Sequence, residues 1–314
     1  EAREINKFHS TFIDSIQRYV HKGKIHSEIN QLRSDQGGTV SGRLSYSNPN
    51  LQQIPARNKE YGNKIRSLFL PEEGKQWGSF DYSQQEPRLV AHYAASINED
   101  FTGADDFIEA YKNEEADFHQ IVADMAGISR TQAKTINLGL FYGMGKAKLG
   151  KELGISKDSA ENLLIKYHSR VPFVKKLAEA VTNSASKYGF IRTIRGRKCR
   201  FDMWEPATFG MNKAMQYEEA KAIYGNNIRR AFTYKALNRL IQGSAADQTK
   251  QAMINCYKQG FKPILQIHDE LCFSINNEND IKGVKEVMEN AIENLKVPFK
   301  VDVALGKSWG EAKE

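Results

Sequence analysis

The chain has 314 residues, of which 40% are hydrophobic and 26% are charged, and its formal net charge is +7. This balance is typical of a globular protein large enough for two or more subdomains, and the excess of positive charge is compatible with a polyanionic partner. Three cysteines without metal-type spacing argue against a disulfide framework or a zinc site, and no apolar run reaches the ~18 residues of a membrane span.

The start of the chain predicts an amphipathic helix, because apolar side chains recur there at helical spacing. These side chains are Ile5, Phe8, Phe12, Ile16 and Tyr19. Gly23 is placed to end the helix. An opening in mid-helix, without a signal peptide, leads us to expect a fragment of a longer protein. A strand pattern over residues 24–30 and turn-rich segments at 35–45 and 48–50 follow.

A strand followed directly by a helix surrounds Asp81. Residues 77–81 predict the strand and residues 84–95 the helix. Ser83 and Glu86 have the spacing of a capping box, in which the two side chains satisfy free N–H groups at a helix start. Asp81 therefore ends a strand where a helix begins, which is a common location for catalytic groups.

The middle of the chain is mainly helical in pattern. Ser129 and Gln132 form a second capping box, which opens a helix that runs to Tyr142 and stops at Gly143. Other predicted helices cover residues 101–111, 117–125, 157–167, 173–188, 211–231, 245–257 and 281–295. A glycine-rich basic hairpin is predicted at 189–197 and a last strand at 299–304. Strands near both ends, with helices between them, predict an α+β fold with a helical insertion.

Residues 266–273 predict a hairpin that carries Asp269 and Glu270 at its tip. Adjacent carboxylates repel each other, so a cation would stabilise them, although a solvated acidic turn is the simpler interpretation of this motif alone. If the strands of Asp81 and Asp269 are neighbours in one sheet, their carboxylates can converge. Two carboxylates that share a pair of Mg²⁺ ions are the usual arrangement for in-line phosphoryl transfer.

Arg130 and Lys134 lie one turn apart on one helix face, and Leu138 and Tyr142 continue this series. Two cations near a helix N-terminus are unfavourable for the helix dipole, so a bound triphosphate would stabilise them. The alternative is a solvated basic helix end.

Three segments, in this order, resemble motifs A, B and C of the family A DNA polymerases, the bacterial DNA polymerase I group and its phage relatives. The segments are Asp81-Tyr82-Ser83-Gln84-Gln85-Glu86-Pro87-Arg88, Arg130-x-x-x-Lys134-x-x-x-Leu138-x-x-x-Tyr142-Gly143 and His268-Asp269-Glu270. Further matches are Ser41-Gly42-Arg43-Leu44-Ser45, Asn48-Pro49-Asn50-Leu51-Gln52-Gln53-Ile54-Pro55, Phe118-His119, and Asn238 with Gln242-Gly243-Ser244-Ala245-Ala246-Asp247. The similarity runs from about Ile5 to Trp309.

The resemblance implies a right-hand polymerase with an antiparallel-sheet palm and helical fingers. The palm would comprise residues 24–98 and 234–314, the fingers 99–233, and the end of the thumb helix 1–23. Most of the thumb and any exonuclease domain would precede this chain. The implied setting is the cytoplasm of a bacterial or phage-infected cell, with no membrane partner; an organellar origin stays open.

The family's roles carry over to matching residues. Asp81, Asp269 and the backbone of Tyr82 resemble the ligands of two Mg²⁺ ions, which Mn²⁺ can replace, and Glu270 resembles the accessory acid. The triphosphate contacts would be Arg130, Lys134 and His119, with Lys134 also a general acid toward pyrophosphate. Leu138, Tyr142, Gln84 and Glu86 would surround the deoxynucleotide. For His119, a satisfied structural histidine is the alternative.

Glu86 matches the residue that excludes a 2′-hydroxyl, a role compatible with capping its own helix. Arg43 and Gln242 resemble minor-groove contacts to primer–template DNA, where pair geometry is tested without reading sequence; surface hydrogen bonds are the alternative. Asn238 and His268 would also contact the DNA.

The chain departs from the family pattern at three places. Leu138 stands where an aromatic residue is usual, which puts sugar discrimination in doubt. Gln85 and Pro87 replace aliphatic residues, a phage-like variant, and residues 205–226 are longer than the matching region. The expected function is template-directed DNA synthesis from dNTPs in replication or repair. A single-subunit RNA polymerase and a non-catalytic nucleic-acid-binding protein are the alternatives, and any processivity factor is unknown.

Overall fold

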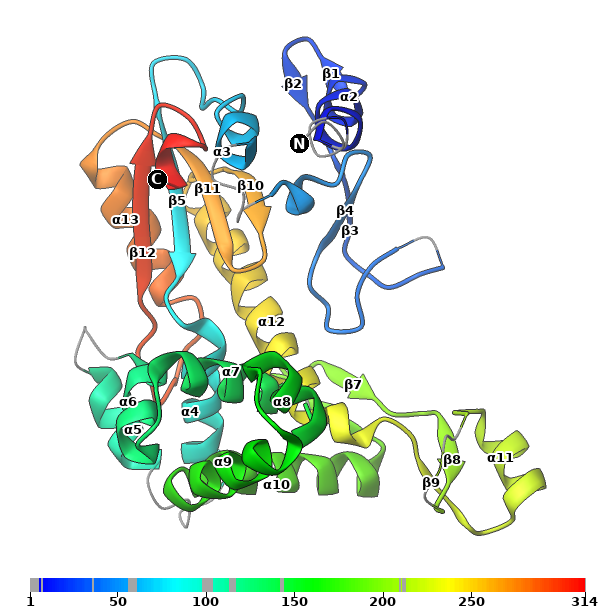
Figure 1. Cartoon of the computed structure of the whole chain (residues 1–314). Helices are drawn as coiled ribbons and strands as arrows, with labels where there is room; N and C mark the ends of the chain where they lie inside the picture. Colours follow the sequence, from blue (N-terminus) through cyan, green and yellow to red (C-terminus); the bar gives the residue numbers. More distant parts are fainter. Residues whose placement is uncertain are drawn as a thin grey trace. The chain divides into compact units, whose positions relative to one another are not determined.

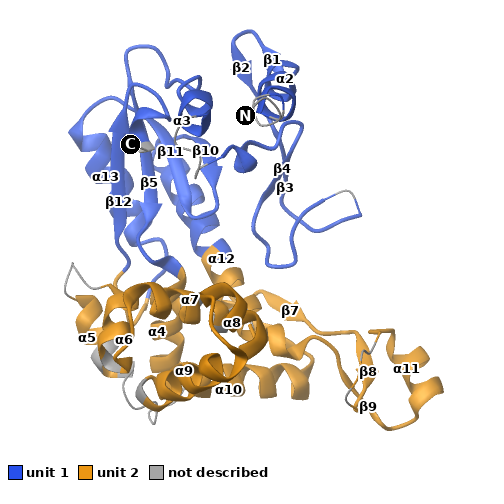
Figure 2. Cartoon of the chain, viewed as in Figure 1, with its two compact units in different colours: residues 1–85, 246–293, 299–314 blue, residues 86–245, 294–298 orange. Residues whose placement is uncertain are grey.

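The computed structural model describes residues 6, 8–35, 37–55, 61–97, 104–112, 117–141, 144–208, 210 and 213–313. The chain forms two compact units, coloured separately in Figure 2. Unit 1 comprises residues 1–85, 246–293 and 299–314, and unit 2 comprises residues 86–245 and 294–298. The palm, fingers and thumb boundaries expected from the sequence stay predictions.

A four-stranded antiparallel sheet forms the centre of unit 1 (Figure 1). Its strand order is β10 (Pro263–Ile267), β11 (Glu270–Ile275), β5 (Gln76–Tyr82) and β12 (Val301–Gly306). The predicted strands around 77–81 and 299–304 and the hairpin at 266–273 are therefore confirmed. Strand β5 lies between β11 and β12, so an early strand pairs on both sides with strands from the end of the chain.

The two faces of the sheet have different partners. The Tyr82 hydroxyl donates a hydrogen bond to the carbonyl of Met288, at 2.6 Å, in α13 (Glu278–Glu289). Since side chains alternate along a strand, Trp77 and Asp81 lie on the face opposite Tyr82. Trp77 stacks on Trp309 there, with ring centroids 6.1 Å apart. The core on this face therefore covers the Trp77 end of β5 and ends before Asp81.

The first helix of unit 1 is shorter than predicted. The smaller elements are η1 (His9–Ile13), α2 (Asp14–Gln17), β1 (Val20–His21), β2 (Lys24–Ile25), β3 (Glu28–Asn30), β4 (Ser45–Ser47), η2 (Leu51–Gln53), α3 (Tyr61–Arg66) and η4 (Glu311–Lys313). The predicted N-terminal helix, observed as η1 and α2, ends at Gln17 rather than at Gly23. Lys22 and Gly23 have φ of 50° and 72° and form the β1–β2 turn, which the helical spacing did not predict.

Unit 2 is mostly helical, with short antiparallel strand pairs toward its end. Its helices are α4 (Gln85–Ile97), α5 (Ala104–Lys112), α6 (Phe118–Ala126), α7 (Arg130–Phe141), α8 (Lys146–Leu153), α9 (Lys157–Arg170), α10 (Pro172–Tyr188) and α11 (Tyr217–Tyr224), followed by η3 (Thr233–Lys235). Its strands are β6 (Phe190–Arg192), β7 (Lys198–Arg200), β8 (Trp204–Pro206) and β9 (Ile228–Arg230). Helix α12 (Ala236–Lys258) contributes to both units.

The prediction of a long helix over 211–231 was wrong. Among the described residues of this range, from 213 onward, α11 alone is helical, and Gly225, with φ of 61°, follows its last residue. Strand β9 then pairs with β8, placing Trp204 opposite Arg230. Helix α12 begins at Ala236, earlier than the predicted 245.

The two predicted capping boxes differ in outcome. At α7, the Ser129 N–H donates to Gln132 Oε1 at 3.0 Å, and the Gln132 N–H donates to Ser129 Oγ at 3.2 Å, which confirms the prediction. At α4, the helix begins at Gln85 and Gln84 has φ of 53°, so Ser83 does not directly precede the helix. None of the described helices is long and apolar enough to cross a membrane.

Candidate active site

The candidate carboxylates of unit 1 lie on adjacent strands. Asp81 in β5 is opposite Glu270 in β11, and the Tyr82 N–H approaches the Asp269 carbonyl at 3.5 Å. Directly opposed residues of an antiparallel pair project from the same face. Asp302 of β12 is opposite Asp81 on the other side, so Glu270, Asp81 and Asp302 form a row across the sheet. The expectation that the Asp81 and Asp269 strands are neighbours is thus met.

Hydrogen bonds from buried glutamine fix the turn that carries Asp269. His268 has φ of 56°, a left-handed conformation that histidine adopts more readily than most residues. Its carbonyl accepts a hydrogen bond from Gln266 Nε2 at 2.6 Å, and Gln266 Oε1 accepts one from Gln52 Nε2 at 3.2 Å. Sequence analysis assigned neither glutamine a role of this kind, because the two are 214 residues apart.

Glu270 has a buried cation nearby. Its Oε1 accepts a contact from Cys272 Sγ at 3.4 Å. Arg66 of α3 is buried and lies over the Trp309 ring, 4.8 Å from the centroid. Burial lowers the pKa of the Arg66 guanidinium, and the charge of Glu270 opposes that change. Sequence analysis missed Arg66, which lies outside the three motifs and partly balances the charge of Glu270.

The structure brings together Arg43 and His268, two residues predicted to contact DNA. Burial lowers the pKa of the His268 imidazole, the charge of Arg43 lowers it further, and Glu270 raises it. The Arg43 guanidinium and the His268 imidazole therefore lie close to the acidic turn, on the same unit.

The residues present fit a magnesium site. Mg²⁺ is usually held by one or two carboxylates together with water and substrate phosphates, rather than by a complete protein cage. Asp81, Asp269 and the Tyr82 backbone are oxygen donors of this kind. No group of three or more His, Cys, Asp or Glu suited to a metal ion occurs within the part of the chain that the structure describes.

In unit 2, α6 and α7 bring together the residues predicted to bind the triphosphate. Asp117 is the N-cap of α6, accepting hydrogen bonds from the N–H groups of His119 and Gln120. Its other oxygen accepts from Arg130 Nε at 2.7 Å. Burial acts to raise the pKa of Asp117, but the Arg130 bond and the backbone N–H groups outweigh it and hold that pKa below its usual value. Asp117 was missed, although an Asp two residues before His119 was an N-cap signal.

His119 is buried and neutral. Its Nδ1 lies 3.0 Å from Asn137 Nδ2, and Asn137 Oδ1 accepts a 2.6 Å hydrogen bond from the Tyr167 hydroxyl. Burial lowers the pKa of His119 to about 4; Asp117 opposes this, while the charges of Lys134 and Arg130 add to it. Both cations therefore lie near the imidazole, and the triphosphate contact of the three residues stays a prediction.

The remaining candidates are described to different extents. Glu86 lies in the first turn of α4 and is partly buried. Asn238 and Gln242 are in α12, and Asn238 Nδ2 is buried with no hydrogen-bond partner in the described structure. Leu138 is within α7, but its side chain, like all of Tyr142, lies outside the described residues.

Gln85, one of the departures from the family pattern, has a structural role. Its Nε2 lies 3.0 Å from Gln248 Oε1 and 3.2 Å from Thr249 Oγ1, both in α12. The side chain is buried, so these hydrogen bonds replace the water it loses and attach the first residue of α4 to α12.

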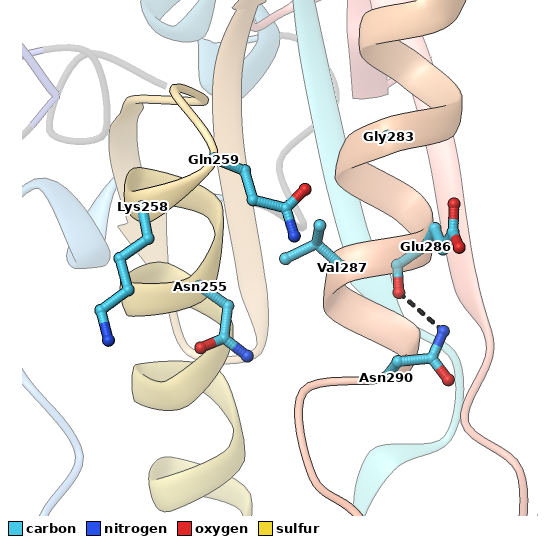
Figure 3. Close-up of a pocket in the computed structure, with 7 residues that line it drawn as sticks. All are labelled: Asn255, Lys258, Gln259, Gly283, Glu286, Val287 and Asn290. Carbon is cyan, nitrogen blue, oxygen red and sulfur yellow. Dashed lines mark hydrogen bonds between the residues drawn. The ribbon is translucent and has the colours of Figure 1, made fainter.

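A polar groove of about 530 Å³ lies between α12 and α13 in unit 1, away from these candidates (Figure 3). Its lining residues are Asn255, Lys258, Gln259, Gly283, Glu286, Val287 and Asn290. Because α13 packs on the Tyr82 face, the groove is not on the Asp81 face. It contains none of the predicted site residues.

Comparison with known proteins identifies the family. Residues 1–311 match the model of DNA polymerase family A. The chain is 37% identical over 359 residues to a DNA-directed DNA polymerase of Pseudomonas phage M6, covering 99% of this chain and 50% of that protein. It is 34% identical over 332 residues to the thermostable DNA polymerase I of Thermus filiformis, covering 100% of this chain and 36% of that protein.

A solved structure agrees with these matches. It is titled as the POL domain of Pol1 from M. smegmatis in complex with DNA primer-template and dNTP, with a TM-score of 0.79 and 31% identity. The match covers 99% of this chain and 53% of that one, and it supports the right-hand polymerase fold. The chain thus spans about half the length, or less, of these relatives. By these matches along nearly its whole length, the chain belongs to DNA polymerase family A.

Proposed function

We propose that the chain is the polymerase domain of a DNA-directed DNA polymerase, which adds deoxynucleotides to a primer 3′-hydroxyl and releases pyrophosphate, in replication or repair. The observation that carries the proposal is the register of β5 and β11, which sets Asp81 beside the Asp269–Glu270 turn. Membership of family A and the likeness to a polymerase solved with primer–template and dNTP support it.

Asp81, Asp269 and the Tyr82 backbone would hold two Mg²⁺ ions. When bound, such ions activate the attacking hydroxyl and neutralise the triphosphate. Glu270, whose charge interacts with that of Arg66, would stabilise the turn that carries Asp269. Arg130, Lys134 and neutral His119 bind the phosphates, and Lys134 Nζ donates a proton to the leaving pyrophosphate. His119 acts as a hydrogen-bond donor rather than as a charge, because burial lowers its pKa to about 4.

Arg43, Asn238, Gln242 and His268 would contact the primer–template, and Glu86 with Gln84, Leu138 and Tyr142 would surround the incoming sugar and base. Glu86 is proposed to exclude a 2′-hydroxyl by occupying its space. If so, Glu86→Ala raises ribonucleotide incorporation relative to deoxynucleotide incorporation, and a wild-type chain that prefers rNTPs would favour an RNA polymerase instead.

Primer extension by the 314-residue chain tests the proposal. Asp269→Asn keeps the side-chain shape but removes the charge, so we expect kcat to fall by about 10²-fold or more while primer–template affinity is retained. Glu286→Gln on α13, an exposed residue on the opposite face, is the matched control and should extend primers normally. Full activity of Asp269→Asn would contradict the catalytic assignment.

A further inference from the structure

Residues 190–240, here named the basic arm, concentrate the positive charge of the chain. They contain eleven Lys or Arg and four Asp or Glu, so their net charge of +7 equals that of the whole protein. The other residues carry thirty-four charges of each sign. Attraction of this chain for a polyanion therefore originates mainly in the basic arm.

The basic arm has a fixed attachment within unit 2. Its β6–β7 hairpin is joined to α12 by two hydrogen bonds, from the Ile194 N–H to Ser244 Oγ at 3.1 Å and from Arg197 Nη2 to the Gly243 carbonyl at 3.0 Å. These bonds attach the hairpin next to Gln242, a proposed DNA contact. In Figure 2, β8, β9 and α11 lie at the end of unit 2 opposite α5 and α6.

Some cations of the arm maintain its own structure. Arg230 donates to the Phe201 carbonyl at 3.0 Å, Arg239 donates to the Arg200 carbonyl at 2.8 Å, and Arg229 pairs with Glu205 at 2.8 Å. Others are exposed and have no carboxylate partner within the described ranges. These are Arg195, Lys198, Arg200, Lys213 and Lys235. Their charges are available to an external anion.

Exposed aromatic rings lie among these cations. Tyr217, Tyr224 and Tyr234 are 38%, 40% and 59% exposed. Lys221 Nζ lies 5.4 Å from the Tyr217 ring centroid, and Lys235 Nζ lies 5.5 Å from that of Tyr234. A surface that combines cations with partly exposed aromatic rings is typical of proteins that bind single strands, since each unpaired base offers a π-face for stacking.

We propose that the basic arm binds single-stranded DNA and, resting on the proposed polymerase function, that this strand is the unpaired template beyond the primer terminus. Duplex DNA could pair its phosphates with the cations of the arm. It could not stack on the tyrosine rings, because its base faces are already stacked on each other. The segment from β8 to β9 includes the whole 205–226 stretch that exceeds the family pattern, so the surface extends beyond what the family resemblance explains.

Fluorescence anisotropy with a labelled oligothymidylate, without Mg²⁺ or nucleotide, tests the proposal. Arg195→Glu/Lys213→Glu should weaken binding by about 10-fold or more near ~100 mM salt and reduce the salt dependence. Tyr224→Ala should weaken it by about 5-fold or more, and Tyr224→Phe should retain binding because the ring is kept.

Lys148→Glu/Lys151→Glu is the matched control, since both lysines are exposed on α8 of the same unit and the charge change is identical. The control should retain single-strand affinity, and Tyr224→Ala should bind blunt duplex within about two-fold of wild type because stacked base pairs offer the ring no free face. Circular dichroism checks folding of each variant. Equal weakening of single-strand binding by the Arg195→Glu/Lys213→Glu and control variants would overturn the proposal. So would a loss of duplex affinity in Tyr224→Ala equal to its loss of single-strand affinity.

Primer extension separates this inference from the polymerase assignment. The arm variants should raise the KM for a primer–template with a long overhang and leave the KM for a one-nucleotide overhang within about two-fold. An unchanged KM for the long overhang refutes the template role. A wild-type chain that binds oligothymidylate through the arm but extends no primer would refute the polymerase function and leave single-strand binding standing.

Discussion

Single side chains set the position of the Asp269 carboxylate. The backbone at His268 is left-handed, and Gln266 Nε2 holds the carbonyl of that residue at 2.6 Å. Gln52 in turn orients the Gln266 amide, so its oxygen accepts and its nitrogen donates. Gln266 is buried, which means that water cannot replace either bond. Asp269 therefore depends on two glutamines that do not themselves bind substrate in the proposed mechanism.

Gln266→Glu tests this dependence. A carboxylate at this position repels the His268 carbonyl, so we expect kcat to fall about 10–100-fold at neutral pH and the Mg²⁺ requirement to rise. Lowering the pH should restore part of the loss relative to wild type, because the introduced carboxyl group regains a donor when it is protonated. The control is Gln53→Glu, which makes the same chemical change at an exposed residue next to Gln52. If the kcat of Gln266→Glu changed with pH in parallel with that of wild type, the positioning role of Gln266 would be contradicted.

At the scale of elements, the start of α7 is built by local bonds that also position the phosphate-binding side chains. The reciprocal Ser129–Gln132 box spans the residue Arg130 and fixes the first turn from which Arg130 and Lys134 project. Asp117, the N-cap of α6, then joins the two helices through Arg130. Hydrogen bonds at the N-termini of α6 and α7 therefore position Arg130 and the helical turn that carries Lys134.

Ser129→Ala should lower the free energy of unfolding by about 1 kcal/mol, because the Gln132 N–H loses its acceptor. Ser96→Ala in α4 is the comparison, since that hydroxyl only bonds back to the His92 carbonyl and alanine is the better helix former. Denaturant unfolding measures both. Equal destabilisation of the two variants would show that the box contributes no more than an ordinary helical serine.

Local patterns predicted the strand ending at Asp81, the acidic hairpin and the α7 capping box, since each depends on residues within a few positions. The helix expected over 211–231 failed because its apolar spacing competes with Gly225 and with pairing of Trp204 to Arg230 across the segment. Arg66 and Gln52 were missed for a related reason. Their contacts are with residues some 200 positions later, and no short-range pattern reports such distances.

For the whole molecule, the half-buried His92 and the buried His119 predict an acid-sensitive fold. Burial lowers the pKa of both His92 and His119 to about 4. Unfolded histidine titrates near ~6.5, so as the pH falls below that value the unfolded chain takes up protons first. Stability is therefore complete above pH ~6.5 and declines until pH ~4.

Thermal unfolding followed by circular dichroism from pH 7 to 5 measures this decline. His92→Asn removes one titrating group and keeps an acceptor for the Lys296 N–H, so its Tm should fall less steeply than that of wild type. His26→Asn, at an exposed position, should follow the wild-type curve. Identical slopes for all three proteins would show that His92 does not contribute.

The sheet order of unit 1 has a consequence for how the protein is made. Strand β5 leaves the ribosome well before both of its partners, because β11 and β12 follow it in the chain by about two hundred residues. At ~5–20 residues per second, β5 waits on the order of ten seconds or more with both edges unpaired. Meanwhile residues 86–245 of unit 2 emerge as one uninterrupted stretch. The nascent chain must therefore shield an apolar strand with two open edges, and Asp81 meets Asp269 only after the β10–β11 hairpin has emerged.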